Sequence, residues 1–401
     1  MQQLSHTALF DVGSRARHFN RAETAAQLLR LRAYLRHFVS TLSDVQMLPP
    51  KLPTLSPPLW EAAHVAWFAE WWCVRDAYNT LDGQTRADRE SVWVNGDTFL
   101  NSNDIAHGAR WNLPQLTRAA TLDYLDRSLA LTIAALDRAD NTDTGLYPFR
   151  LAMFHEAMHL EALAWAAQTL AWARPAWVSD APRGGAGGVR GAQHSAASTE
   201  ALAHAKRDAL GFDESGFSFD NEREPHTRPI AAFTIESKPV SNAAFALFVE
   251  SATYEQTFAA KHPFFWRNSA NGWQQRRFDQ WIDLAADEPV IHLSAFEADA
   301  FCAWAGVRLP SEFEWEIAAK RGLINWGNSA WEWTSSTFAP YPGFSADRYR
   351  EYSSPWFDGK HRVLRGGSYA TLDLMHHSSY RNYFLPERRD VFAGFRTCAA
   401  K

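Results

Sequence analysis

The sequence contains few cysteines and no long apolar run. Its three cysteines, Cys73, Cys302 and Cys398, lie far apart among 401 residues, and no CxxC pair occurs. This spacing argues against a disulfide scaffold and against a cysteine-based zinc site. No stretch approaches the roughly 18 uncharged apolar residues of a membrane span, and no basic segment followed by an apolar core opens the chain. We therefore expect a cytoplasmic protein without a secretory signal or membrane span.

Positive charge is not in excess either. Lysine and arginine total 40 and aspartate and glutamate total 45, which gives a formal net charge of −5. Because a protein that binds nucleic acid by neutralising phosphates is usually basic, we expect no nucleic-acid partner. Internal repeats of about 20–50 residues are absent, which excludes a solenoid. Aromatic residues, in contrast, make up 14% of the chain, and such a content excludes a chain that is disordered throughout.

The first part of the chain is predicted to be helical. Apolar residues recur there at helical spacing in four segments, and four long helices predict a bundle whose sites are built from inward-facing side chains. The segments are residues 22–45, 59–78, 116–138 and 147–173.

The second part has a different composition. A stretch rich in Gly, Ala and Ser, with a Gly-rich run at 183–188, is typical of a flexible linker or loop. Beyond it, Trp, Phe, Gly and Pro are dense, and the pattern predicts a strand over 229–235 and short helices over 242–251 and 294–305. The sequence thus predicts an α+β protein with three regions. These are a helical bundle at 1–178, a linker at 179–219 and a second domain at 220–401.

The strongest local motif is the HExxH pattern from His155 to His159. Two histidines four residues apart lie about 40° apart around a helix, so both can bind one metal ion. His64 is a candidate third ligand, because its helical neighbours are apolar and its face should point into the bundle. Three neutral imidazoles suit zinc, iron, copper or nickel and leave coordination positions open. The alternative for His64 is a hydrogen-bonded histidine of the core.

Three charged residues accompany these histidines. In zinc proteases with an HExxH motif the glutamate, here Glu156, is the general base; otherwise we expect it to orient a ligand or to be exposed. Glu161 lies about 200° from His159 around the helix, so we expect it to face solvent or to support a ligand from outside. Arg110 lies in a loop between predicted helices. It is either a clamp for an anionic substrate or a surface salt-bridge residue.

The arrangement of His64, His155 and His159 resembles the DinB-like helical domain of the ergothioneine-pathway sulfoxide synthases. The second part of the chain is independently similar to the formylglycine-generating-enzyme domain, which has a C-type-lectin-like fold. The segments that carry this similarity are Pro289–Glu316, Gly327–Thr334, Pro340–Phe344, Val363–Ser368, Tyr380–Tyr383 and Phe392–Arg396. Formylglycine-generating activity itself is disfavoured, because that chemistry uses two nearby cysteines, whereas Cys302 and Cys398 stand in separate motifs.

The resemblance implies a mononuclear non-haem iron(II) site bound by the three histidines and closed by the second domain. It implies an O₂-dependent reaction that attaches a sulfur or selenium donor to C2 of the imidazole of hercynine, which is trimethylhistidine. The same resemblance implies a tyrosine that donates a proton or a hydrogen atom, for which Tyr341 is the candidate. The alternatives are Tyr349, Tyr352 and Tyr380.

The donor pocket departs from that of the best-known thiol-using branch of this family. In that branch an aspartate that holds the amino group of γ-glutamylcysteine stands where this chain has Phe384, and an arginine stands where it has His107. Phenylalanine cannot accept a hydrogen bond from an ammonium group. The resemblance therefore favours the selenoneine synthases, which take a neutral selenosugar. The substrate-binding residues that it implies are Arg110, Met158, Asn382, Tyr383 and Phe384.

Three other functions stay open at this point. An ergothioneine-type enzyme would use a thiol donor such as γ-glutamylcysteine or cysteine. A zinc hydrolase would use the HExxH motif without O₂, and a lectin-like module would bind a ligand without catalysis. In the favoured interpretation the cofactor is iron(II), and the partners are small molecules: hercynine, the donor and O₂.

Overall fold

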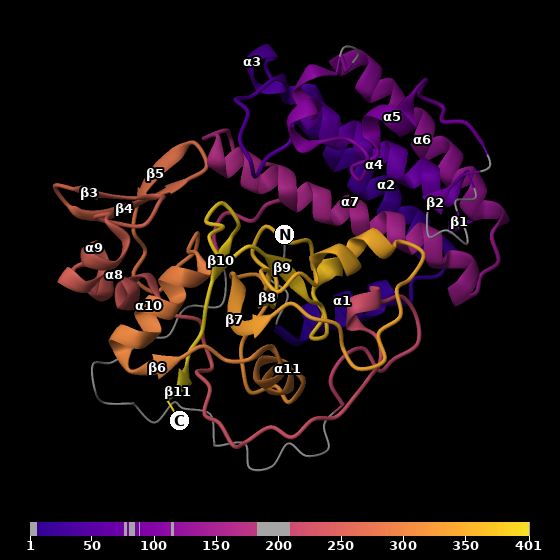
Figure 1. Ribbon diagram of the computed structural model, residues 1–401. Coiled ribbons are helices and arrows are strands. Elements are labelled where there is room, and N and C mark those ends of the chain that lie inside the picture. The colour runs from indigo at the N-terminus through magenta and orange to yellow at the C-terminus, as the bar shows by residue number, and fades with distance from the viewer. Residues whose placement is uncertain are drawn as a thin grey trace.

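A computed structural model describes residues 6–75, 78–79, 85–87, 89–113, 116–182 and 209–400. A helical bundle lies against a second lobe that is built from short strands, short helices and loops (Figure 1). This arrangement confirms the predicted α+β fold class. The Gly-rich run at 183–188 lies outside the described residues. No helix in the described part of the chain combines the length and the apolar character that a membrane crossing needs.

Four long helices form the bundle. They are α2 (Arg21–Thr41), α4 (Pro58–Cys73), α6 (Arg118–Arg138) and α7 (Asp143–Thr169). Helices α2 and α4 each pack against both α6 and α7. Side-chain caps from Asn20, Thr117 and Thr142 fix the first turns of α2, α6 and α7. Asn20 and Thr117 lie close to the predicted starts at 22 and 116, whereas α7 begins before the predicted start at 147.

Helix α4 is the central element, because every one of its 16 residues is buried. Its sequence is apolar around the whole circumference, which is the pattern of a helix that is covered on all sides. The short helices α3 (Asp44–Met47), α5 (Gly96–Leu100) and η1 (His107–Asn112) belong to the connections around the bundle. The two-residue strands β1 (Tyr78–Asn79) and β2 (Thr85–Arg86) pair after α4.

Helix α1 (His6–Arg17), which the periodicity does not predict, packs on the second lobe. It lies against η5 (Asp373–Met375) of that lobe, and the buried guanidinium of Arg17 donates to Glu222 Oε2 over 2.8 Å. The N-terminal end of the described chain therefore joins the two lobes.

The core of the second lobe is a four-stranded sheet in the order β10-β7-β8-β9. Its strands are β7 (Trp331–Thr337), β8 (Arg362–Arg365), β9 (Asn382–Phe384) and β10 (Ala393–Gly394). Strand β8 pairs antiparallel with β7 and β9, and β10 pairs parallel with β7. Buried ion pairs hold this lobe together: Arg365 donates to Glu312 and Glu316, and Arg381 donates to Glu312.

The remaining elements surround this sheet. The helices are α8 (Asn242–Val249), α9 (Ala252–Phe258), α10 (Ala295–Ala305) and α11 (Glu312–Lys320). The other strands are β3 (Trp266–Ser269), β4 (Gly272–Arg277), β5 (Gln280–Asp283), β6 (Val307–Arg308) and β11 (Cys398–Ala399). Single-turn helices complete the lobe: η2 (Asp220–Glu222), η3 (Arg350–Tyr352) and η4 (Ser354–Trp356).

Two local expectations need correction. Residues 229–235 do not form a strand; only Ile235 makes an isolated bridge, to Cys398. Residues 209–219, which the composition assigned to the linker, pack into the second lobe. The backbone N–H of Gly211 donates to Glu316, and Phe217 and Phe219 are buried in the core.

Glu161 of α7 joins the two lobes. From its place on the helix we expected this residue to face solvent or to support a metal ligand from outside. The carboxylate is buried, and one oxygen, Oε1, accepts hydrogen bonds from Trp331, Ser368 and Thr371 over 2.7, 2.8 and 2.8 Å. All three donors belong to the second lobe. The expectation was wrong because the second lobe covers the face of α7 that points away from the bundle.

Two substitutions of Glu161 should distinguish the effect of losing its hydrogen-bond acceptor from the effect of losing its charge. In Glu161→Leu three buried donors lose their partner, so we expect a loss of about 3 kcal/mol or more in unfolding free energy. Glu161→Gln keeps an oxygen at the Oε1 position, so its unfolding temperature should stay close to that of the wild type. Thermal unfolding of both variants measures the difference. Equal losses in the two variants would contradict this account.

Candidate metal centre

The three predicted histidines lie together between α4 and α7. His64 comes from α4, His155 and His159 come from α7, and one nitrogen of each lies within 4.8 Å of the others. The Nε2 atoms of His155 and His159 are 3.1 Å apart. Burial lowers the pKa of His64 and of His155 well below the usual value. Both imidazoles are therefore neutral at physiological pH, which is the form that binds a metal ion.

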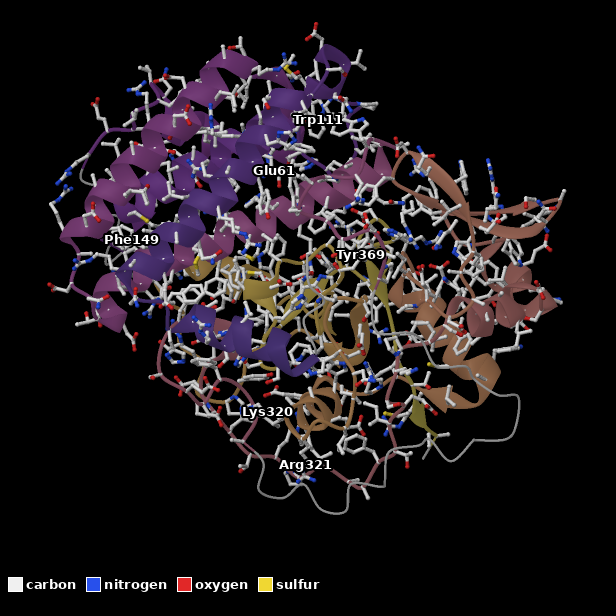
Figure 2. All side chains as sticks on the ribbon, turned by 180° about the vertical axis from the view of Figure 1, so that it is seen from behind. Glu61, Trp111, Phe149, Lys320, Arg321 and Tyr369 are labelled. Atoms are coloured by element: carbon white, nitrogen blue, oxygen red, sulfur yellow. The ribbon has the colours of Figure 1, made fainter. Side chains whose placement is uncertain are left out.

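The outer nitrogens of two histidines have hydrogen-bond partners. His64 Nδ1 lies 2.7 Å from the carbonyl oxygen of Leu100, and His159 Nδ1 lies 2.7 Å from Glu61 Oε1. Figure 2 shows Glu61 within the bundle, and its side chain is buried. Such contacts fix the tautomer and the orientation of metal-binding imidazoles. The sequence analysis missed Glu61, although its place one helical turn before His64 was a usable signal.

The third histidine is held by ring packing. His155 stacks on Phe68 with ring centroids 3.5 Å apart and an angle of 5° between the planes. Its Nδ1 atom is buried and has no hydrogen-bond partner in the described structure. Three converging imidazoles fit an ion of the zinc, iron, copper or nickel type. The donor set therefore fits the iron that the resemblance implies, without selecting it over the other three.

Glu156 does not face this centre as a free carboxylate. Its two oxygens accept hydrogen bonds from Arg32 over 2.9 and 3.2 Å, and both side chains are 1% exposed. Arg32 also donates to Ser128 of α6. A general base must lie within reach of the reacting water and take up its proton, and a buried carboxylate that is paired with a guanidinium is poorly suited to accept one. The expectation that Glu156 orients a ligand or is exposed is wrong: this residue ties α7 to α2 and α6.

The candidate tyrosines fall into two groups. Tyr349 packs its ring against Phe68 at 5.0 Å and against His155 at 6.4 Å. Tyr341 lies instead in the buried charge network of the second lobe, where its hydroxyl donates to Glu312 and accepts from Arg365.

The other two tyrosines are linked to α7. The hydroxyls of Tyr352 and Tyr380 are 3.3 Å apart, and that of Tyr352 also lies 3.6 Å from the sulfur of Met158. Met158, one of the predicted pocket residues, is the residue before His159. These contacts bring Tyr352 and Tyr380 near the histidine-bearing part of α7.

Two of the remaining predicted pocket residues pack against aromatic residues of the helices that carry the histidines. The guanidinium of Arg110 lies 4.0 Å from the ring of Trp60, which in turn stacks on His64 at 5.0 Å. Phe384 packs edge-on against Trp165 of α7 at 5.7 Å.

The two residues before Phe384 are turned to local partners. Tyr383 stacks on Phe338 at 3.9 Å, and its hydroxyl donates to the backbone carbonyl of Tyr352. The side-chain oxygen of Asn382 accepts from the backbone N–H of Tyr383.

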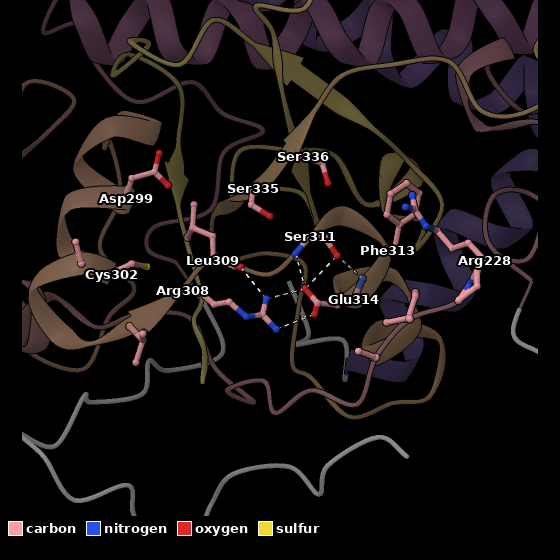
Figure 3. A pocket seen from close by; sticks show the side chains of 15 residues that line it. Arg228, Asp299, Cys302, Arg308, Leu309, Ser311, Phe313, Glu314, Ser335 and Ser336 are labelled. Carbon is pink, nitrogen blue, oxygen red and sulfur yellow. Dashed lines mark hydrogen bonds and ion pairs between the residues drawn. The ribbon is translucent and has the colours of Figure 1, made fainter. Parts of the chain in front are cut away.

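Two cavities of the described structure are large enough to consider as substrate-binding sites. One of about 330 Å³ adjoins His64 and is lined by residues of both lobes. A larger one, of about 670 Å³, lies within the second lobe between α10 and α11 (Figure 3). In that cavity Arg308 is paired with Glu314, and Asp299 is paired with Arg362. The guanidinium of Arg228, which also lines this cavity, lies over the ring of Phe313, and none of the three histidines is among the lining residues.

Comparison with known proteins identifies both lobes. Residues 27–164 match the DinB superfamily, and residues 208–329 and 320–401 match the sulfatase-modifying factor enzyme 1-like domain. The formylglycine-generating enzyme of Streptomyces coelicolor is 28% identical over 44% of this chain and 77% of its own length. These matches agree with the bundle and with the second lobe.

Three relatives match across both lobes. The hercynine oxygenase of Mycobacterium tuberculosis is 31% identical over 93% of this chain and 98% of its own length. Those of Mycolicibacterium smegmatis and Mycolicibacterium thermoresistibile are 30% and 29% identical, over 86% and 94% of this chain and 91% and 94% of their own lengths. This degree of identity, over nearly the whole of both chains, shows that the protein belongs to the hercynine oxygenase family.

Proposed function

We propose that this protein catalyses the O₂-dependent coupling of a chalcogen donor to C2 of the imidazole of hercynine. The observation that carries the proposal is the cluster of His64, His155 and His159 beneath the second lobe of a chain that belongs to the hercynine oxygenase family. Hercynine loses the hydrogen at C2, the donor loses its S–H or Se–H hydrogen, and a carbon–chalcogen bond forms. O₂ supplies the oxygen of the resulting sulfoxide or selenoxide, and its second atom leaves as water.

Iron(II), which the family resemblance implies, would be held by the three imidazoles and would supply O₂ activation. The chain itself keeps the imidazoles of His64 and His155 neutral by burial, and it orients those of His64 and His159 through the carbonyl of Leu100 and through Glu61. A zinc hydrolase of the HExxH type is a weaker candidate, because Arg32 occupies the carboxylate that would have to act as its base. The lectin-like binding module does not account for three converging imidazoles.

The residues around Phe384 favour a donor without an ammonium group. Phe384 lies between Trp165 and the guanidinium of Arg388, whose centre is 4.8 Å from the phenyl ring. The guanidinium itself donates to both carboxylate oxygens of Asp390, and the phenyl ring offers no acceptor where the thiol-using branch has an aspartate. An ammonium group would therefore find no hydrogen-bond acceptor on this ring, whereas a neutral sugar can stack on it. We propose a selenosugar as the donor; the alternative is a thiol such as γ-glutamylcysteine or cysteine.

His107 contributes no fixed positive charge to this pocket. Burial lowers its pKa, and its Nε2 lies 2.6 Å from the carbonyl oxygen of Leu55. A carbonyl only accepts, so Nε2 carries the proton and the ring is neutral. Arg110 remains as the cation near Trp60. A donor with two carboxylates would thus find one guanidinium where the thiol-using branch offers two.

We also propose that Tyr349, rather than Tyr341, is the tyrosine that acts on the reacting groups. It packs against Phe68 and His155, whereas Tyr341 is bound within the network of Glu312 and Arg365. Burial raises the pKa of the Tyr349 phenol. The hydroxyl is consequently protonated at neutral pH and can donate a proton or a hydrogen atom.

A competition assay tests the reaction and the donor together. The iron-loaded protein receives O₂, hercynine and equal amounts of selenoglucose, thioglucose, cysteine and γ-glutamylcysteine, and mass spectrometry identifies the adduct. We expect the selenosugar adduct to dominate. In Phe384→Asp the new carboxylate should favour γ-glutamylcysteine by about tenfold, the effect of one charge-assisted hydrogen bond of roughly 1.5 kcal/mol.

Metal analysis after anaerobic purification is the control for this assay. Iron should accompany the wild type and should be lost in His155→Ala. An adduct of γ-glutamylcysteine from the wild type would overturn the selenosugar proposal but keep the reaction. No adduct with any donor, together with bound zinc, would overturn the reaction itself.

The tyrosine assignment predicts different effects of two matched substitutions. Tyr349→Phe should lower the rate of coupling by about 100-fold or more, because it removes a positioned proton donor. Tyr341→Phe should keep the rate and lower the unfolding temperature, because only a hydrogen bond in the second lobe is lost. Single-turnover rates and thermal unfolding of both variants distinguish these outcomes. A large rate loss in Tyr341→Phe with full activity in Tyr349→Phe would reverse the assignment.

A further inference from the structure

The segment that carries Tyr349 has little regular structure of its own. η3 is a single 3₁₀ turn, in which the N–H of Tyr352 donates to the carbonyl oxygen of Tyr349 over 3.2 Å. Such short turns have poorer hydrogen-bond geometry than an α-helix. Tyr349 lies directly before the turn, and Ser353 lies directly after it. The position of the Tyr349 ring therefore depends on what holds the two ends of this segment.

One buried carboxylate, that of Asp220 in η2, contacts both ends. Its Oδ1 atom accepts a hydrogen bond from the hydroxyl of Ser353, and its Oδ2 atom accepts one from the backbone N–H of Asp347 over 3.4 Å. Asp347 precedes Tyr349 in the chain, and Ser353 follows it. Asp220 and Ser353 are 3% and 0% exposed. A single buried side chain thus spans the segment from Asp347 to Ser353.

The residue after Asp220 strengthens this attachment. The side-chain nitrogen of Asn221 donates to the hydroxyl oxygen of Ser353 over 2.9 Å. The Ser353 hydroxyl therefore accepts one hydrogen bond and donates another, which uses its only hydrogen. We refer to the contacts of Asp220 and Asn221 with Ser353 and Asp347 as the η2 clamp.

η2 is itself held in place by buried groups. Glu222 Oε2 accepts from the guanidinium of Arg17 in α1 and from the hydroxyl of Ser379, over 2.8 and 2.7 Å. The carbonyl oxygen of Asn221 accepts from Arg381 over 2.8 Å. All five residues are buried. A displacement of η2 would leave buried charged groups without partners, so η2 is a firm support for the segment.

The segment faces the metal centre. The ring of Tyr349 lies 5.0 Å from that of Phe68 and 6.4 Å from that of His155. The ring of Tyr352 stacks on Phe219, which directly precedes η2, with centroids 4.3 Å apart. The short stretch 219–222 thus contacts the segment both through the clamp and through a ring.

We propose that the η2 clamp positions the hydroxyl of Tyr349 for its action on the reacting groups. The inference rests on the proposed function, in which Tyr349 donates a proton or a hydrogen atom. Such a donor must lie within hydrogen-bond reach of the atom that receives its hydrogen, and a displacement of about 1 Å can cost about 100-fold in rate. Because Tyr349 lies beside a single turn, this precision has to come from contacts outside the segment. Asp220, Asn221 and Ser353 are positioning residues that act through Tyr349.

A double-mutant cycle distinguishes positioning from general stabilisation. Ser353→Ala removes the hydroxyl at the middle of the clamp, and we expect the single-turnover rate of coupling to fall about tenfold. In the Tyr349→Phe background the same change should alter the residual rate by less than about twofold, because the positioned hydroxyl is already gone. Tyr254→Phe is the matched control, since it breaks a buried hydroxyl–carboxylate bond to Glu297 elsewhere in the second lobe. It should lower the unfolding temperature and leave the rate unchanged.

A second measurement needs neither metal nor substrate. In metal-free protein that contains 3-fluorotyrosine, the ¹⁹F resonance of Tyr349 is identified by its loss in Tyr349→Phe. Ser353→Ala should shift or split this resonance, whereas Tyr254→Phe should leave it unchanged. Asp220→Asn keeps one acceptor oxygen, so we expect a smaller change of the same resonance. This variant takes the place of Ser353→Ala in both measurements if Ser353→Ala does not fold.

Two results would overturn the proposal. An equal loss of rate from Ser353→Ala with and without the Tyr349 hydroxyl would assign the clamp to stability alone. An unaltered Tyr349 resonance in Ser353→Ala would show that the clamp does not fix the ring. If the resonance changes as expected while the wild type gives no adduct with any donor, the clamp holds Tyr349 and the proposed reaction fails.

Discussion

The position of α7 between the bundle and the second lobe is the constraint on which the rest of the structure depends. This helix carries His155 and His159 on the face toward α4 and, two residues later, the carboxylate that binds the second lobe. Each face of α7 therefore meets a different partner. Because the Glu161 contact holds Trp331, Ser368 and Thr371 within a few residues of the metal-binding pair, the second lobe cannot shift without disturbing the histidines.

Burial of this helix places a limit on the charges near the centre. An unpaired charge inside a protein is costly, and the structure satisfies this limit in two ways. Glu156 is neutralised by Arg32, and the imidazoles of His64 and His155 are kept neutral because burial lowers their pKa. A metal ion would thus meet two imidazoles, those of His64 and His155, from which no proton has to be removed. The same glutamate that suggests a protease from sequence serves the packing of three helices.

The sequence was sufficient for the three histidines and for the two-part architecture. Spacing along a helix determines which side chains share a face, and the apolar neighbours of His64 indicate which way that face points. Contacts between the lobes were not accessible in this way. The position of Glu161 suggested solvent because a helical wheel assumes one buried face. The sequence pointed to Tyr341 instead of Tyr349. A loop sequence does not indicate that one tyrosine contacts a buried charge network and the other contacts His155.

The asymmetry of the centre follows from these two lobes rather than from the histidines. Helix α4 alone would offer a wall of tryptophans at one end of the centre and Trp60 at the other. The second lobe adds Glu351 to the first end and Phe384 with Arg388 to the second. These additions make the two ends chemically different without any change in the imidazoles. Substitutions in the second lobe, such as Phe384, can therefore change the chemistry of one end while the three imidazoles stay as they are.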